Sequence, residues 1–258
     1  MLAMDVSGSM RATDVEPTRL VAAQNAAKAF LRDLPRHVRV GIVAFAGTAQ
    51  VAQLPTLSRE DLVTAIDRFQ LQRGTATGNG IVLSLATLFP DDGIDIGQMT
   101  WGKPPTKTKS LDDAAKPKKD VAPVAPGSYT SAAIIMLTDG QRTTGVDPME
   151  AAKMAADRGV RVYTVGVGTT SGETIGFEGW SMRVRLDEDT LKQIANRTAA
   201  EYFYAGTATD LKKVYNTLST RLALEKKETE ISGIFALIAA AFAMIAAALS
   251  LAWFGRVT

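Results

Sequence analysis

Three oxygen-bearing side chains alternate along one short segment near the start of the sequence. The segment reads DVSGSM and places Asp5, Ser7 and Ser9 at every second position, directly after the apolar residues 1–4. In a turn that leaves a strand, this spacing can direct one carboxylate and two hydroxyls at a single centre. Oxygen donors suit a hard cation, and Mg²⁺ in particular keeps several waters beside a few protein ligands. The spacing therefore predicts part of a site for Mg²⁺ or another divalent cation.

Two further oxygen donors occur where a folded chain could bring them to the same centre. Asp139 follows the apolar run AAIIML in the sequence LTDG, and Thr75 lies in RGTATGNG just before a helical pattern. Open α/β sheets bind ligands at the carboxyl edge of their strands, where the strand order reverses. Taken singly, each of these residues has an ordinary explanation in a turn or a helix cap. Taken together, they predict one metal site, with no catalytic residue and no organic cofactor. Its members are Asp5, Ser7, Ser9, Thr75 and Asp139.

The segments between these residues alternate between strand and helix patterns. Runs of strand length are expected at 1–4, 38–45, 49–54, 132–137, 160–167 and 201–204. Helical spacing of apolar residues is expected at 14–34, 58–69, 78–88, 148–157, 187–197 and 210–224. Strands that alternate with helices predict an α/β fold with a doubly wound, mostly parallel, Rossmann-like sheet covered on both faces. Residues 169–186 are glycine-rich and are expected to form a hairpin.

Residues 91–131 interrupt this alternation. The segment contains five prolines and six lysines and shows almost no periodic apolar pattern. Long segments of this composition inside a domain are typically disordered surface insertions. The lysines could contact an acidic partner or lipid headgroups, but the composition favours a solvated loop. We therefore expect a disordered insertion at 91–131 within a domain that covers residues 1–224.

The sequence from 234 to 254 is almost uniformly apolar, with Ser250 as its only polar side chain. A helix of about 21 residues is about 30 Å long, which is enough to cross a bilayer. We expect a transmembrane helix at 234–254, a juxtamembrane linker at 225–233, and a protein located in the cell membrane. The span is rich in alanine, which permits close helix approach, so oligomerisation through this helix is a further hypothesis.

The composition excludes several other chemistries. The chain has no cysteine and one histidine, His37, so it offers no thiol nucleophile, zinc ribbon or His-rich metal site. With 29 basic and 27 acidic side chains, it lacks the positive excess of a protein that binds nucleic acid. No histidine, cysteine or lysine lies near the candidate metal motifs to act as a general base, so an enzyme is not expected. A magnesium-dependent hydrolase or phosphotransferase is the alternative, because Mg²⁺ can activate water or bind a phosphoryl group.

The motifs resemble those of a known family. DVSGSM, GTATG and LTDG resemble the metal-ion-dependent adhesion site (MIDAS) of von Willebrand factor A (VWA) domains, over most of residues 1–224. DVSGSMRATDVEPTRL, and VRLDEDTLKQIA followed by AEYFYA, are similar to bacterial membrane-anchored VWA proteins of the aerotolerance (Bat) type. The resemblance implies direct metal contact from Ser7 and Ser9. It implies contact from Asp5, Thr75 and Asp139 either directly or through water, and Thr77 is the neighbour most easily confused with Thr75.

The same resemblance implies partners and a location. A protein partner would supply a carboxylate to the open coordination position of the metal. The resemblance to Bat-type proteins further implies that the protein acts together with a MoxR-type AAA ATPase in assembling envelope proteins. Proteins of this type usually carry two membrane helices before the domain, whereas this sequence begins at its first strand. We therefore expect upstream membrane spans to be missing from this chain.

Overall fold

The computed structural model describes most of the chain in two units, Met1–Ala223 and Leu224–Thr258. The described residues are 1–95, 97, 122–177, 180–207, 209–211, 213–215, 217–218, 239–240, 242–246 and 249. In the second unit the described residues are helical. None of the helices in these described ranges is long and apolar enough to cross a membrane. The predicted linker at 225–233 lies outside the described residues, as does most of the predicted span at 234–254.

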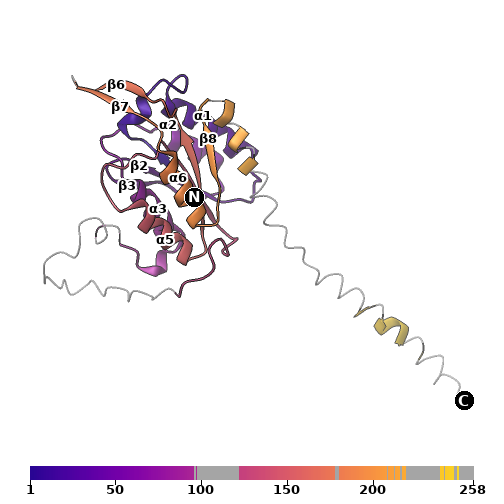
Figure 1. Ribbon diagram of the computed structural model, residues 1–258. Helices are drawn as coiled ribbons and strands as arrows, with labels where there is room; N and C mark the ends of the chain where they lie inside the picture. Colours follow the sequence, from indigo (N-terminus) through magenta and orange to yellow (C-terminus); the bar gives the residue numbers. More distant parts are fainter. Residues whose placement is uncertain are drawn as a thin grey trace, which may run out of the picture. The chain divides into compact units, whose positions relative to one another are not determined.

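A six-stranded sheet forms the centre of the first unit (Figure 1). Its strands are β1 (Leu2–Asp5), β2 (Val40–Phe45), β3 (Ala49–Thr56), β4 (Ala133–Thr138), β5 (Arg161–Val167) and β8 (Tyr202–Ala205). They lie in the order β3-β2-β1-β4-β5-β8, and every neighbouring pair is parallel except β2 and β3. β1 and β2 are buried along their whole length because helices cover both faces of the sheet. The predicted mostly parallel α/β sheet is confirmed.

The helices are divided between the two faces of the sheet. They are α1 (Arg19–Asp33), α2 (Arg59–Asp67), α3 (Thr77–Leu88), α5 (Pro148–Asp157) and α6 (Glu188–Arg197), with short 3₁₀ helices η1 (Gly8–Arg11) and η2 (Pro90–Asp92). α1, α2 and the helical residues at 209–218 pack on one face, and α3, α5 and α6 pack on the other. The prediction that the first helix begins at residue 14 was wrong. Thr18 caps α1 by accepting a hydrogen bond from the Val21 N–H, so the helix starts at Arg19.

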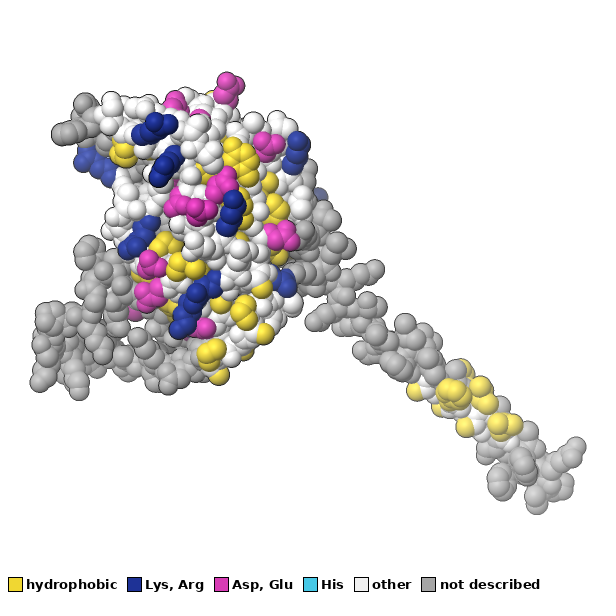
Figure 2. All heavy atoms as spheres, viewed as in Figure 1, with side chains coloured by type: hydrophobic (Ala, Val, Ile, Leu, Met, Phe, Trp, Pro, Cys, Tyr) yellow, Lys and Arg dark blue, Asp and Glu magenta, His cyan; other side chains and the backbone are white. Residues whose placement is uncertain are grey.

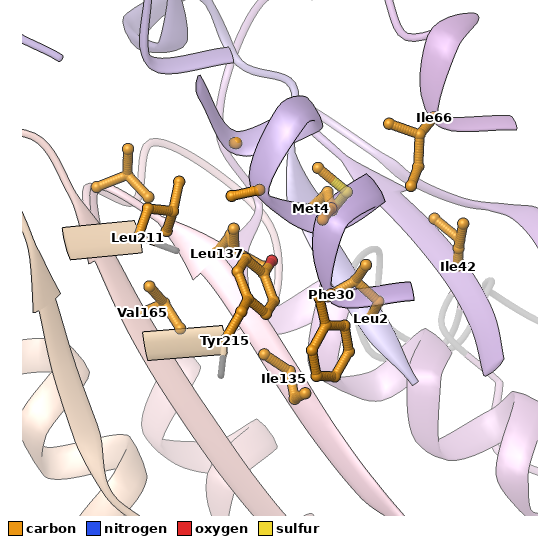
Figure 3. Packing of buried hydrophobic residues seen from close by; sticks show 14 of the residues in the cluster. Leu2, Met4, Phe30, Ile42, Ile66, Ile135, Leu137, Val165, Leu211 and Tyr215 are labelled. Atoms are coloured by element: carbon orange, nitrogen blue, oxygen red, sulfur yellow. The ribbon is translucent and has the colours of Figure 1, made fainter. Parts of the chain in front are cut away.

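Apolar side chains from α1, from the sheet and from the last helical segment of the first unit, the helical residues at 209–218, meet in one core (Figure 3). Tyr215 is 1% exposed, and the centroid of its ring lies 4.7 Å from that of Phe30 on α1. Leu211 and Leu218, one helical turn to either side of Tyr215, are fully buried in the same core. The last helical segment is therefore an integral layer of the domain.

A separate two-stranded sheet consists of β6 (Glu173–Phe177) and β7 (Trp180–Val184), which pair antiparallel. This is the hairpin predicted within 169–186. Ile175 and Val184 pack against Ala12, which follows η1. The apolar contact attaches the hairpin to the loop that carries Ser7 and Ser9.

The two described ends of the predicted insertion lie close together. The ring centroids of Phe89 and Tyr129 are 5.4 Å apart, and Arg158 Nε donates to Asp92 Oδ2 at 2.9 Å. The Val124 N–H donates to the Asp157 carbonyl at 3.0 Å, at the end of α5. Residues 96 and 98–121 lie outside the described part of the chain, so disorder across 91–131 stays a prediction.

Candidate metal centre

Four of the five predicted site residues, all but Thr75, lie at or just beyond the carboxyl ends of β1 and β4, which are adjacent parallel strands. β2 follows β1 on one side of this pair, and β5 follows β4 on the other, so the strand order reverses between them. Asp5 is the last residue of β1, and Asp139 directly follows the last residue of β4. The two carboxylates therefore occupy the switch point at which open α/β sheets bind ligands.

A network of short hydrogen bonds holds the DVSGSM segment against β4. Asp5 Oδ1 accepts from the Ser7 N–H at 2.8 Å, and Asp5 Oδ2 accepts from Thr138 Oγ1 at 2.6 Å. The hydroxyl oxygens of Ser7 and Ser9 are 2.9 Å apart, and Ser9 also hydrogen-bonds the Asp139 carboxylate. The structure thus brings Asp5, Ser7, Ser9 and Asp139 together. Thr138 was missed in the sequence, although its place beside Asp139 in LTDG is a signal that could have found it.

Backbone hydrogen bonds place the Thr75 loop between the other two loops. The Gln72 N–H donates to the Val6 carbonyl at 2.8 Å, which holds this loop beside β1. On its other side, the Thr143 N–H donates to the Thr75 carbonyl at 2.9 Å, and the Thr75 N–H donates to Thr143 Oγ1 at 2.8 Å. The Thr75 side chain is buried. Thr77 is also buried, and its hydroxyl has no hydrogen-bond partner among the residues that the structure describes.

Arg19 is a buried cation that the sequence reasoning did not select. Its Nε and Nη2 atoms donate to the two carboxylate oxygens of Asp14, both at 2.7 Å. Its Nη1 donates to Asp139 Oδ2 at 3.1 Å, and its side chain is 0% exposed. A charged residue on the buried face of a helix pattern is a signal that could have identified it, because such a charge requires a partner.

Burial perturbs both carboxylates of the site. Burial and the nearby charge of Asp139 raise the pKa of Asp5 to about 7, against the opposing effect of hydrogen bonds from Ser7 and Thr138. Burial also raises the pKa of Asp139, while hydrogen bonds and the charge of Arg19 oppose this shift. A cation between the two carboxylates would offset the cost of burying their charges and the repulsion of Asp5 by Asp139.

The donor set fits a hard cation. The described residues contain no cluster of three or more His, Cys, Asp or Glu side chains that could hold a metal. Two carboxylates with serine and threonine hydroxyls instead form an oxygen-only set, which matches Mg²⁺ better than a soft or strongly nitrogen-seeking metal.

A doubly wound sheet with hydroxyls and carboxylates at its switch point defines a class of ligand-binding α/β domain. Models of the von Willebrand factor type A domain match residues 1–141 and 124–217, and the chain belongs to this family. The family predicted from DVSGSM, GTATG and LTDG is confirmed.

Curated relatives include UPF0353 proteins of mycobacteria. The protein of Mycolicibacterium gilvum (strain PYR-GCK) is 35% identical over 233 residues, which cover 87% of this chain and 60% of the relative. The protein of Mycobacterium bovis (strain BCG / Pasteur 1173P2) is 33% identical over 231 residues, with the same coverage. The chain therefore spans about 60% of the length of the curated relatives it matches.

Solved structures with the same fold include proteins of the predicted Bat type. BatB from Bacteroides thetaiotaomicron has a TM-score of 0.63 and 24% identity, covering 88% of this chain and 98% of its own. An aerotolerance-related membrane protein from Bacteroides fragilis NCTC 9343 has the same score and identity, covering 86% and 98%. Proximal thread matrix protein 1 from the mussel byssus, with a zinc-occupied MIDAS motif, has a TM-score of 0.51 and 17% identity, covering 86% and 46%.

Proposed function

We propose that this chain is a protein-interaction module that binds its partner through Mg²⁺ or another divalent cation. The residues that would hold the cation are Asp5, Ser7, Ser9, Thr75 and Asp139. The observation that carries the proposal is the meeting of two buried carboxylates, 1% and 0% exposed, with paired serine hydroxyls at the sheet switch point. A cation held mainly by neutral hydroxyls stays electrophilic and can accept a carboxylate from a partner protein.

The family and the surface support a protein partner. VWA domains generally mediate adhesion or protein-protein interaction. On the face shown in Figure 2, acidic and basic side chains are interspersed among apolar ones. Such a mixed surface suits a protein partner better than the phosphate backbone of a nucleic acid. Work alongside a MoxR-type AAA ATPase in envelope protein assembly is part of this proposal and rests on the likeness to Bat-type proteins.

Membrane anchoring through residues 234–254 is the second part of the proposal. It is supported by the apolar sequence of this segment and by the exposed Phe242, Met244, Ile245 and Leu249 in its described helical residues. The structural neighbour from Bacteroides fragilis is itself described as a membrane protein. Oligomerisation through the alanine-rich span belongs to the same proposal.

Magnesium titration of the full chain in detergent micelles tests the site. We expect calorimetry to show magnesium binding that Ser7→Ala weakens at least about tenfold. Loss of a residue that only hydrogen-bonds a metal ligand typically weakens binding by about tenfold or more, and loss of a ligand itself should weaken it at least as much. Ser58→Ala is the matched control, because Ser58 caps α2 away from the site and should leave the affinity unchanged. Equal affinity in all three proteins would refute the site.

The threonine of the site can be identified by a paired substitution. Thr75→Ala is expected to weaken magnesium binding about tenfold, because hydrogen bonds through Gln72 and Thr75 hold the Thr75 loop against both neighbouring loops. Thr77→Ala should leave the affinity within about twofold, because the resemblance of GTATG to the family motif assigns the hydroxyl ligand to Thr75. A loss of affinity in Thr77→Ala with none in Thr75→Ala would transfer the hydroxyl ligand to Thr77.

The alternative, a magnesium-dependent hydrolase or phosphotransferase, is separated by a second measurement. Retention of a protein partner in magnesium and its release by chelator support the binding module. Magnesium-dependent hydrolysis of p-nitrophenyl phosphate, with no retained partner and with loss of turnover in Ser7→Ala, would support the enzyme.

A further inference from the structure

Arg19 is fixed in place from several directions. The two carboxylate oxygens of Asp14 accept from it at 2.7 Å each, and the N–H of Arg19 itself donates to the Ala12 carbonyl at 2.9 Å. Gly168 lies against its guanidinium so closely that a Cβ there would be 2.6 Å from Arg19 Cζ. The side chain is 0% exposed, and the close packing of protein interiors leaves such a side chain little room to move.

Asp14 is itself held from the other side. Its Oδ2 atom accepts from the N–H and the hydroxyl of Thr169, both at 2.9 Å. Its own N–H donates to Glu173 Oε2 of the hairpin at 3.0 Å. The Asp14 and Arg19 pair is therefore a rigid anchor built between the loops that follow β1 and β5.

Asp139 is bound to this anchor. Its Oδ2 atom accepts from Arg19 at 3.1 Å, and its Oδ1 atom accepts from the Gln141 N–H at 3.2 Å. Asp5, by contrast, accepts from the N–H and the hydroxyl of Ser7 and from the Thr138 hydroxyl, and none of these donors is charged. The two carboxylates of the site thus differ in charge environment, because Asp139 alone shares its negative charge with a guanidinium.

We infer that Arg19 is a positioning residue that holds Asp139 back from direct coordination, so that the cation keeps enough positive charge to bind a partner's carboxylate. This inference rests on the proposed function. If Asp139 moved onto the cation, it would have to leave a guanidinium that cannot follow it. With Asp139 paired to Arg19, the site would bind the cation itself less tightly, and the bound cation would bind a partner's carboxylate more tightly.

Two variants change the charge of the anchor in opposite directions. Arg19→Gln removes the positive charge and frees Asp139, so magnesium affinity should rise about tenfold or more and carboxylate affinity should fall. Asp14→Asn keeps Arg19 but removes its other counter-ion, so Arg19 pairs more fully with Asp139. In this variant magnesium affinity should fall about tenfold, and the cation that does bind should hold a carboxylate at least as tightly.

The experiment titrates MgCl₂ into the full chain in detergent by calorimetry, and then titrates acetate at saturating MgCl₂, followed by NMR. Opposite shifts in magnesium affinity for Arg19→Gln and Asp14→Asn, with the reverse order for acetate, support the inference. Weakened magnesium binding in both variants, or no change in either, overturns it and assigns Arg19 a merely structural role. Absence of magnesium binding in the wild-type chain would instead refute the proposed function itself. If Arg19→Gln does not fold, the acetate titration of Asp14→Asn decides the question: an acetate affinity at or above that of the wild type supports the inference, and a lower one overturns it.

Discussion

Asp5→Asn is expected to abolish measurable magnesium binding while stabilising the metal-free protein at pH 8. Magnesium affinity should fall by about 100-fold or more, because an amide replaces a charged ligand. The free energy of unfolding in chelator should rise by about 2 to 4 kcal/mol, because the variant removes a buried negative charge that faces Asp139. The amide introduced by this substitution can still accept from the Ser7 N–H and donate to the Thr138 hydroxyl oxygen. Calorimetry and urea unfolding measure the two effects.

The pH dependence of this stability has a definite sign. The pKa of Asp5 is about 7 in the folded protein, above its value in the unfolded chain, so the folded state binds the extra proton between about pH 4 and 7. In chelator, the wild-type protein should therefore lose stability as the pH rises through this range, and magnesium should restore it. Asp5→Asn should lack this component, whereas Asp67→Asn, an exposed partner of Lys28, should keep it. A wild-type protein that gains stability from pH 5 to 8 in chelator would contradict the assignment.

Tyr215→Ala is expected to lower the free energy of unfolding by about 3 to 5 kcal/mol, because it leaves a cavity between α1 and the last helical segment. Tyr215 is 1% exposed and packs on Phe30 (Figure 3), so the surrounding core has little freedom to collapse. Urea unfolding followed by circular dichroism measures the loss.

The matched variant Tyr215→Phe separates packing from hydrogen bonding. The Tyr215 hydroxyl is buried and has no hydrogen-bond partner among the described residues. Removing it should leave the stability unchanged or raise it by about 1 kcal/mol, because a buried unsatisfied polar group is itself destabilising. A loss of more than about 1 kcal/mol in Tyr215→Phe would show that the hydroxyl is satisfied in solution.

Local sequence pattern predicted most of the fold because most of its elements have local causes. Pro148 opens α5 and Asp147 caps it, so the predicted bounds of 148–157 agree with the structure. The predicted start of the first helix at 14 was wrong for a tertiary reason. The Asp14 carboxylate accepts hydrogen bonds from Arg19 and Thr169 outside the helix, and Thr169 lies 155 residues away in the sequence. No periodicity within 14–34 carries that information.

The same division explains which parts of the site could be predicted. Asp5, Ser7 and Ser9 share one short turn, and Asp139 follows an apolar strand, so residue type and local context were sufficient to select them. Arg19 hydrogen-bonds Asp139, which is 120 residues away in the sequence, and no residue near Arg19 in the sequence indicates this partner. The assignment of these residues to a metal stays a prediction that the magnesium titrations test.

The contact between Phe89 and Tyr129 has a consequence for how this domain can vary in length. The chain leaves and re-enters the fold at neighbouring points, and the pair Asp92 and Arg158 together with the Val124 N–H fixes both points to α5. For any flexible connection between two such points, each doubling of its length adds only about 0.6 kcal/mol of closure entropy. The length of this segment can therefore change, in evolution or by protein engineering, without compensating substitutions in the sheet or in the candidate metal centre.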